Sequence, residues 1–321
     1  MHSSSIACTG RPRATRARLA ARGLPAVGLA CAILLAAAPA GAQSFPLSQA
    51  VDVGPEATLV VDTARGRVEV TTGDGPIRVE GDVVVRMGWN VPADAPARAR
   101  AVAAAPPIDV RGSSVLLGYP TEARTRNAVI IHWRVRVPRS TKVDVQTVSG
   151  EVRVAGVDAP VRVRSGSGAT TVRDAHGGVT VVGRSGAIVL DRVAGDVEVR
   201  SGSGAVDIDM AAAGAVDVTT QSSAIEVDGA SSALRASSGS GTIRVGGAPA
   251  ADWYLETRSS RITIAPDRGG YGLDLRSRSG RVTSDLTGDV ATEHELRRAA
   301  DNGAVITARS GSGAIDLRTG S

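Results

Sequence analysis

Aromatic residues and cysteines are scarce in this sequence. Of its 321 residues only seven are aromatic: three Trp, three Tyr and one Phe. Sheets built from open hairpins need large core residues such as aromatics. With so few aromatics, this composition favours a fold with a narrow interior filled by Val, Ile, Leu, Ala and Ser. The two cysteines, Cys8 and Cys31, both lie within the first 42 residues. The rest of the chain therefore has neither a thiolate metal site nor a cysteine nucleophile.

Acidic residues are missing from the first 42 positions, and this changes the meaning of the net charge. The chain has 37 Lys and Arg against 32 Asp and Glu, but five arginines lie in the acid-free stretch, which leaves 37 − 5 = 32 basic and 32 acidic residues after it. A net charge of zero removes the main support for a polyanion partner. We therefore expect no nucleic acid among the partners.

The first 42 residues have the features of a secretory signal. Arginine-rich residues 1–23 precede an apolar run from Leu24 to Ala38, and small residues follow up to Ala42. This order predicts cleavage between Ala42 and Gln43. The apolar run is shorter than the ~20 residues that span a bilayer, so no integral membrane segment is expected after signal removal. The predicted location is extracytoplasmic, either periplasmic or secreted.

A serine recurs at a nearly constant spacing through the second half of the chain. Successive intervals are 18, 18, 18, 19, 18, 19, 20 and 33 residues, so only the last holds an insertion, at about residues 287–305. The marked serines are Ser149, Ser167, Ser185, Ser203, Ser222, Ser240, Ser259, Ser279 and Ser312. Apolar residues occupy the position six before each marked serine and, in most repeats, the position three after it. Self-similarity at a short fixed period indicates a repeat architecture.

Each repeat contains two short alternating strands with a glycine corner between them. Two architectures fit this pattern: antiparallel hairpins that turn at Ser-Gly, or a β-solenoid with one coil per repeat. Like residues at like positions favour the solenoid, because parallel in-register stacking places Ser on Ser and Val on Val about 4.8 Å apart. We predict an all-β fold in which residues 143–321 form a β-solenoid (single-stranded β-helix) of about 18-residue coils, with its handedness left open.

Residues 43–142 are rich in expected strands but less regular. This N-terminal β region is predicted to be continuous with the solenoid as irregular coils. Two helices are expected, at Ala97–Ala105 and, inside the late insertion, at Glu293–Ala300. The expected strands are Leu59–Val61, Val68–Val70, Ile77–Val79, Val83–Val85, Ile108–Val110, Val115–Leu117 and Val129–Val137.

The order of these features resembles a widespread bacterial adhesin-like family of β-strand repeats, domain of unknown function 4097. The resemblance is carried by the strands at Gly66–Val70 and Val135–Pro138, the Val145–Gly150 segment and the Ser-Gly-Ser-Gly series. It covers roughly residues 55–321. It implies a β-repeat fold and offers no catalytic residues to carry over to this chain.

Patterns typical of catalytic or metal sites are missing. His132, His176 and His294 lie in separate segments without metal-ligand spacing. The Ser-Gly corners match neither a phosphate loop, whose Lys they lack, nor a G-x-S-x-G nucleophile elbow. Apolar residues such as Val206 occupy the position of the aspartate in calcium-binding nonapeptides. We therefore predict no catalytic residue, cofactor or metal.

One group of acidic residues is a speculative site. Counting four and six residues past the marked serines places five acids on three adjacent coils, pointing outward, and we call these five the acidic ladder. Stacked carboxylates about 4.8 Å apart repel one another, which suggests a cation or a basic partner. The alternative, which we favour, is a solvated face relieved by Arg173 and Arg244 on the flanking coils. The ladder consists of Asp191, Asp207, Asp209, Glu226 and Asp228.

Two functions from different classes remain. The favoured one is an exported, non-enzymatic structural or interaction (adhesin-like) module of the bacterial cell envelope, whose partner is an unknown envelope protein or polysaccharide. The alternative is a carbohydrate-active β-helix enzyme, a lyase or hydrolase, which needs aromatic stacking platforms and a carboxylate pair or a basic residue in a groove. Trp253 falls in the inward apolar column. The remaining platform candidates are Trp89, Tyr119, Tyr254 and Tyr271.

Overall fold

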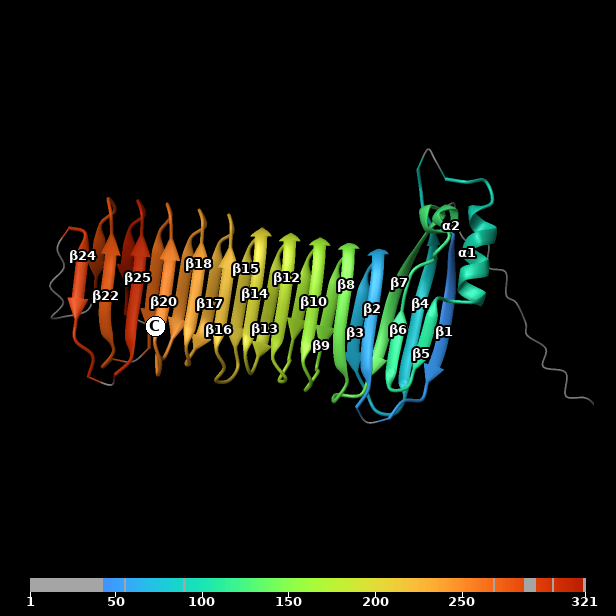
Figure 1. Cartoon of the computed structure of the whole chain (residues 1–321), viewed down its shortest axis with the longest axis horizontal. Coiled ribbons are helices and arrows are strands. Elements are labelled where there is room, and N and C mark those ends of the chain that lie inside the picture. The colour runs from blue at the N-terminus through green and yellow to red at the C-terminus, as the bar shows by residue number, and fades with distance from the viewer. Residues whose placement is uncertain are drawn as a thin grey trace, which may run out of the picture. The chain divides into compact units, whose positions relative to one another are not determined.

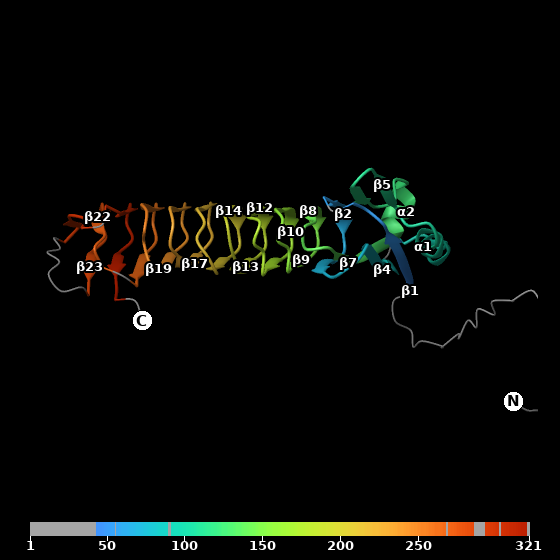
Figure 2. The same ribbon diagram turned by 90° about the horizontal axis from the view of Figure 1, so that it is seen from below.

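The structure is a computed structural model that describes residues 43–54, 56–88, 91–267, 269–285, 293–301 and 303–319. Its strands form two sheets that face one another (Figures 1 and 2). Sheet A contains, in spatial order, β1 (Ser44–Val51), β4 (Ile77–Val85), β7 (Val129–Val137), β3 (Val68–Thr72), β9 (Val152–Ala155), β11 (Thr170–Arg173), β13 (Ile188–Val193), β15 (Val206–Met210), β17 (Ile225–Ala230), β19 (Ile243–Gly247), β21 (Ile262–Pro266), β26 (Ile315–Leu317) and β23 (Val282–Ser284). Sheet B contains, in the opposite direction along the stack, β24 (Glu295–Arg298), β22 (Gly272–Ser277), β25 (Val305–Ser310), β20 (Trp253–Thr257), β18 (Leu234–Ser238), β16 (Val216–Thr220), β14 (Val197–Ser203), β12 (Val179–Ser185), β10 (Val161–Ser167), β8 (Lys142–Ser149), β2 (Thr58–Arg65), β6 (Ser114–Leu117) and β5 (Ile108–Arg111).

Each repeat contributes its first strand to sheet B and its second strand to sheet A, and the two strands together make one coil. Neighbouring repeat strands are parallel and in register, so that Val161 lies beside Val179 and Ser167 beside Ser185. The apolar columns point between the sheets, where Val163, Val181 and their equivalents are fully buried. Burial contributes roughly 1.5–3 kcal/mol for each such side chain. The β-solenoid prediction is confirmed, and the hairpin alternative is excluded.

Behind the glycine corners, small hydroxyl side chains continue the inward alternation of sheet B. Nine of them are buried, and we call them the hydroxyl column: Thr63, Thr147, Ser165, Ser201, Thr220, Ser238, Thr257, Ser277 and Ser310. The Ser238 hydroxyl accepts from the Gly241 N–H at 2.8 Å and donates to the Ser223 carbonyl of the neighbouring coil at 3.1 Å. Such bonds satisfy backbone groups at the corner and link adjacent coils.

The expected strands of the N-terminal region are all present, with β4 uniting two of them, and β1 was not foreseen. The helix expected at Ala97–Ala105 is α1 (Ala95–Ala104). A second helix that the sequence did not suggest, α2 (Ala123–Ala128), lies beside it. Arg98 of α1 links the two, because its guanidinium contacts Glu122 at 2.8 Å and Thr125 at 2.9 Å. No helix among the described residues is long and apolar enough to cross a membrane.

The order of the coils departs from the order of the sequence at both ends of the stack. The first coil, β2/β3, lies between β6/β7 and β8/β9. The last coil, β25/β26, lies between β20/β21 and β22/β23 (Figure 1). Neither the first coil nor the last coil in the sequence therefore lies at an end of the stack. Each lies between two other strand pairs.

The helix expected at Glu293–Ala300 is wrong. Residues Glu295–Arg298 form strand β24, which pairs antiparallel with β22 so that Leu296 lies opposite Leu275. Leu296 is buried. The free edge of β22 offers backbone hydrogen bonds, and this tertiary pairing overrides the helical propensity of Glu, Leu, Arg and Ala.

Candidate binding surfaces

The acidic ladder lies on the outer face of sheet A. Strands β15 and β17 pair in register, which places Asp207 beside Glu226 and Asp209 beside Asp228. Asp191 ends the same face on β13, beyond a register shift. Their apolar neighbours Ile208 and Val227 are fully buried (0% exposed), so the alternation turns the acids outward. The structure thus places the five side chains on three adjacent coils.

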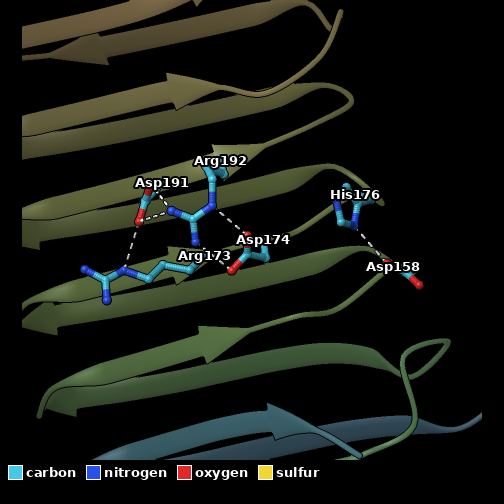
Figure 3. Close-up of polar contacts among 6 residues, drawn as sticks. All are labelled: Asp158, Arg173, Asp174, His176, Asp191 and Arg192. Atoms are coloured by element: carbon cyan, nitrogen blue, oxygen red, sulfur yellow. Dashed lines mark hydrogen bonds and ion pairs between the residues drawn. The ribbon is translucent and has the colours of Figure 1, made fainter.

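The ends of the ladder are neutralised, in part by a residue that the sequence did not suggest. Glu226 pairs with Arg244 at 3.2 Å, and Asp191 pairs with Arg173 at 3.2 Å. Asp191 also contacts Arg192 at 3.1 Å (Figure 3). Among the described residues, Asp207, Asp209 and Asp228 have no ion pair. The favoured view of an arginine-relieved face therefore holds for the edges and not for the centre.

Arg192 connects two coils at the corner beyond the ladder. Its guanidinium binds Asp174 of the preceding coil through two bonds, at 2.8 and 2.9 Å (Figure 3). Both residues have positive φ, 50° for Asp174 and 54° for Arg192, a left-handed conformation that aspartate tolerates and that is unfavourable for arginine. The hydrogen bonds and charge of Arg192 hold the pKa of Asp174 below its usual value. The bidentate pair thus compensates for the strained backbone of Arg192.

The centre of the ladder has the opposite electrostatic character. Partial burial, followed by repulsion from Glu226 and the other ladder acids, raises the pKa of Asp207 and of Asp228. A carboxyl whose pKa is raised by folding binds protons more strongly in the folded state. Its contribution to stability therefore falls as the pH rises from its unfolded pKa through the raised value, and is lowest at neutral pH.

Neutralising the centre should stabilise the protein. We expect Asp207→Asn/Asp228→Asn to raise the melting temperature at pH 7, because it removes repulsion between neighbouring carboxylates. The rise should be only roughly 1–3 °C, because solvent screens the repulsion between exposed groups. The gain should shrink as the pH falls through the raised pKa of the two carboxyls and vanish below about pH 3, where they are protonated; it should also shrink in high salt. Thermal melts followed by circular dichroism at both pH values measure it.

The matched control removes two exposed acids of sheet B that lie outside the ladder, Asp62 and Asp217, by the same substitutions. Equal gains in both double variants, or no gain in either, would contradict the ladder's role. Millimolar calcium should shift melting little. A calcium-dependent rise of several degrees that the ladder variant loses would instead make this face a metal site.

The other residues that the sequence singled out are dispersed. His132 accepts the Arg67 N–H at 3.0 Å, His176 contacts Asp158 at 2.8 Å (Figure 3), and His294 contacts the Gly280 carbonyl at 2.8 Å. No three His, Cys, Asp or Glu residues in the described part of the chain are grouped so as to hold a metal ion.

The aromatic platform candidates are also scattered. Trp253 is fully buried, with its indole N–H donating to the Ser232 carbonyl at 3.1 Å, as its place in the inward column predicted. Tyr271 is buried too, at 2% exposed, so its proposed role as an exposed platform is wrong. Arg235 covers the Tyr254 ring and Arg126 the Tyr119 ring, while Trp89 lies outside the described residues.

Sheet B carries a second surface that the sequence reasoning missed. The residue just before each marked serine points outward at the corner, and we call these residues the corner row. In spatial order they alternate strictly between glycine and a longer residue: Val148, Gly166, Arg184, Gly202, Gln221, Gly239, Arg258, Gly311 and Arg278. The alternation has a period of two coils. It could have been read from the repeat alignment up to Arg258, but there the sequence order breaks it.

Close backbone approach explains the glycines of the corner row. A Cβ on Gly166, Gly202 or Gly239 would lie 2.3–2.5 Å from the carbonyl oxygen of the preceding coil, closer than any side chain allows. At Gly311 the distance would be 2.2 Å, to the Arg258 carbonyl. Side chains at this position are thus restricted to every second coil, and a gap remains between them.

The gaps join into a depression along the outer face of sheet B. One part, of about 840 Å³, extends from β8 to β16, and the next, of about 730 Å³, continues to β22. The two parts meet at Thr220 and Gln221. We call the whole depression the corner groove. It extends over nine strands, roughly 38 Å at about 4.8 Å per strand.

The corner groove is basic although residues 43–321 carry no net charge. Its lining includes six arginines, Arg164, Arg184, Arg200, Arg258, Arg278 and Arg309, and the one acid Glu256. Arg164 and Arg309 contact Asp144 and Asp274 at 3.4 Å, and Arg200 contacts Glu198. Within the described residues, Arg184, Arg258 and Arg278 have no ion-pair partner. Folding thus separates charges that cancel in the composition.

Comparisons with known proteins address the family. Residues 122–318, more than half of the chain, match the family described as Toastrack DUF4097. No curated protein gives a significant match. Among solved structures, a "putative cell adhesion protein" from Clostridium sporogenes aligns with 86% of this chain and 100% of its own, at 10% identity and a TM-score of 0.28. The family match confirms the resemblance seen in the strand and Ser-Gly motifs: the chain belongs to the Toastrack DUF4097 family.

Proposed function

We propose that this protein is an exported, non-enzymatic module of the bacterial cell envelope that binds a partner along the corner groove of sheet B. The observation that carries the proposal is the groove itself, a basic depression repeated over many coils. A regular solenoid presents the same surface at each step, which suits an extended partner rather than a small molecule. The secretory signal expected at residues 1–42 supports an extracytoplasmic location.

The groove fits binding better than hydrolysis. Glycoside hydrolysis uses two carboxyl groups that flank the bond to be cleaved. The described lining of the corner groove contains one, Glu256, which accepts a hydrogen bond from the Tyr254 hydroxyl at 3.2 Å. A lyase remains the alternative function, because arginines line the groove, and its product would carry an unsaturated sugar.

Fractionation of producing cells tests the proposal. When the full-length chain is produced, it should be exported from the cytoplasm. The intact mass of the exported protein should correspond to a chain that begins at Gln43. Purified residues 43–321 should then sediment with isolated envelopes and leave them at high salt, because the groove binds through charge. The proposal would be refuted by a chain that stays in the cytoplasm and retains residues 1–42. It would also be refuted by a processed chain that does not sediment with envelopes.

A further inference from the structure

We propose that the corner groove binds a linear acidic polysaccharide laid along the stack of coils, with anionic groups spaced one per disaccharide. The corner-row arginines that have no ion pair within the described residues, Arg184, Arg258 and Arg278, hold some of these groups, and they lie two or four coils apart. This inference rests on the proposed function and names the class of its partner. It is drawn from the spacing of the arginines, from the glycine gaps and from the chemistry of the lining.

The arginines of the groove form two staggered rows. On the glycine coils they stand two residues before the corner row, at Arg164, Arg200 and Arg309. On the coils between, they stand in the corner row itself, at Arg184, Arg258 and Arg278, listing from β8 toward β22. In the corner row, Arg258 and Arg278 are two coils apart, about 9.6 Å, and Arg184 lies four coils from Arg258, about 19 Å. Arg164, Arg200 and Arg309, on the glycine coils, are paired with acids. The two-coil step is about 9.6 Å. That distance is close to the length of one disaccharide in an extended polysaccharide.

The glycine gaps give a ligand access to these charges. Gly202 lies two residues after Arg200 on the same coil, and its lack of a side chain leaves the arginine uncovered on the corner side. Arg184 and Gln221 project on either side of this gap, because they occupy the corner row on the neighbouring coils. A polysaccharide chain that runs along the groove would thus contact a long side chain on one coil and exposed backbone at a glycine on the next.

The rest of the lining favours an acidic sugar polymer over nucleic acid. Ser, Thr and Gln side chains occupy the positions between the arginines, and these suit sugar hydroxyls. The described lining contains no aromatic side chain, whereas binding of single-stranded nucleic acid depends on aromatic stacking. A neutral sugar would also need an aromatic platform. Recognition here therefore depends on charge and hydroxyl contacts.

Fluorescence anisotropy with defined oligosaccharides tests the inference on residues 43–321. The probe is a labelled hyaluronan decasaccharide, which carries one carboxylate per disaccharide. The first competitor is an oligogalacturonate with the same total number of carboxylates as the probe but one on every sugar. The others are a neutral chitin oligosaccharide and oligo-dT. We expect hyaluronan to bind about threefold or more tightly than oligogalacturonate, and the neutral sugar and oligo-dT to compete poorly.

Matched variants locate the site. Arg184→Gln/Arg258→Gln should weaken hyaluronan binding at least about tenfold, because two charge-assisted contacts are lost. The control, Arg153→Gln/Arg244→Gln, removes the same charge from the outer face of sheet A and should stay within about twofold of wild type. Gln221→Arg adds an arginine to the corner row between Arg184 and Arg258 and should tighten binding about threefold. Thr263→Arg on sheet A should not change the affinity. A gain of affinity cannot arise from misfolding.

The outcomes separate this inference from the proposed function. Envelope binding that survives Arg184→Gln/Arg258→Gln would overturn both the inference and the groove as the binding site. Envelope binding that this variant loses, together with no binding of hyaluronan to the wild type, would overturn the inference alone. Equal competition by oligo-dT would show a non-specific polyanion surface and also overturn it, as would preference for oligogalacturonate. An unsaturated product released from hyaluronan would overturn the non-enzymatic function while the groove assignment stands.

Discussion

Gly186→Ala should lower the melting temperature by roughly 6–12 °C, corresponding to about 3 kcal/mol or more of lost stability. Gly186 has φ of +121° at the corner of a central coil. A Cβ placed there would lie 2.3 Å from the Gly168 carbonyl oxygen and 2.7 Å from its carbon. Gly168 and Gly204 make the same 2.3 Å approach to the coils before them. The backbone has no direction in which to move without disturbing the next coil.

Two further glycine substitutions separate the causes of this loss. At Gly75 a Cβ would meet nothing within 4 Å, although φ is +89°, so Gly75→Ala should lose only about 1 kcal/mol through backbone strain. Gly183 lies in the same coil as Gly186, at the position of the hydroxyl column, and its Cβ would meet only Ile188 Cδ1, at 3.4 Å. We therefore expect Gly183→Ser to melt near wild type. Chemical denaturation of the three variants measures the differences.

The result that would contradict this account is equal stability of Gly186→Ala and Gly75→Ala. It would mean that the coils separate at little energetic expense and that the carbonyl contact does not determine the spacing. A large loss in Gly183→Ser would likewise show that the buried corner, rather than the glycine contact, governs stability.

Removal of residues 303–321 should undock β22, β23 and β24. Strands β25 and β26, which this deletion removes, are the parallel partners through which β22 and β23 join β20 and β21. The described residues 269–285 and 293–301 should then exchange amide hydrogens at rates within about tenfold of the unfolded chain, and proteolysis should cut after β21. The edges of β20 and β21 become exposed, so the truncated chain should also aggregate more readily.

Two other truncations provide the comparison. Removal of residues 319–321 alone, which follow β26, should leave exchange unchanged. Removal of residues 268–321 exposes the same edges without the loose segment and should melt at the same temperature as the chain that lacks 303–321. Persistent protection of residues 272–284 after removal of 303–321 would contradict the account, because it would show that β22 and β23 can dock directly on β20 and β21.

Such direct docking is disfavoured at the corner row. It would bring Arg278 to the coil next to Arg258, about 4.8 Å along the stack instead of about 9.6 Å, with two unpaired positive charges side by side. It would also remove Gly311 from its contact with the Arg258 carbonyl. The two-coil alternation therefore gives a physical reason for the insertion of the last coil between two earlier ones.

The sequence by itself determined the unit of the fold. Inward columns such as Val161 and Val179, the Ser-Gly corners and the outward ladder at Asp207 and Glu226 are all properties of one repeat, decided by alternation and by the need for glycine at the turn. Every coil faces nearly the same environment, so local pattern was sufficient. The burial of Trp253 followed from its column in the same way.

Only the tertiary structure decided which coils are neighbours. The repeats present interchangeable edges, so nothing local distinguishes β22 from β25 as the partner of β20, and that choice depends on contacts across the stack such as Gly311 against Arg258. The strand at Glu295–Arg298 has the same origin, because a free sheet edge overrode a helical sequence. The basic groove also emerged only on folding, since the zero net charge of residues 43–321 cannot report that six arginines line one groove of sheet B while Asp207, Asp209 and Asp228 lie on sheet A without an ion pair among the described residues.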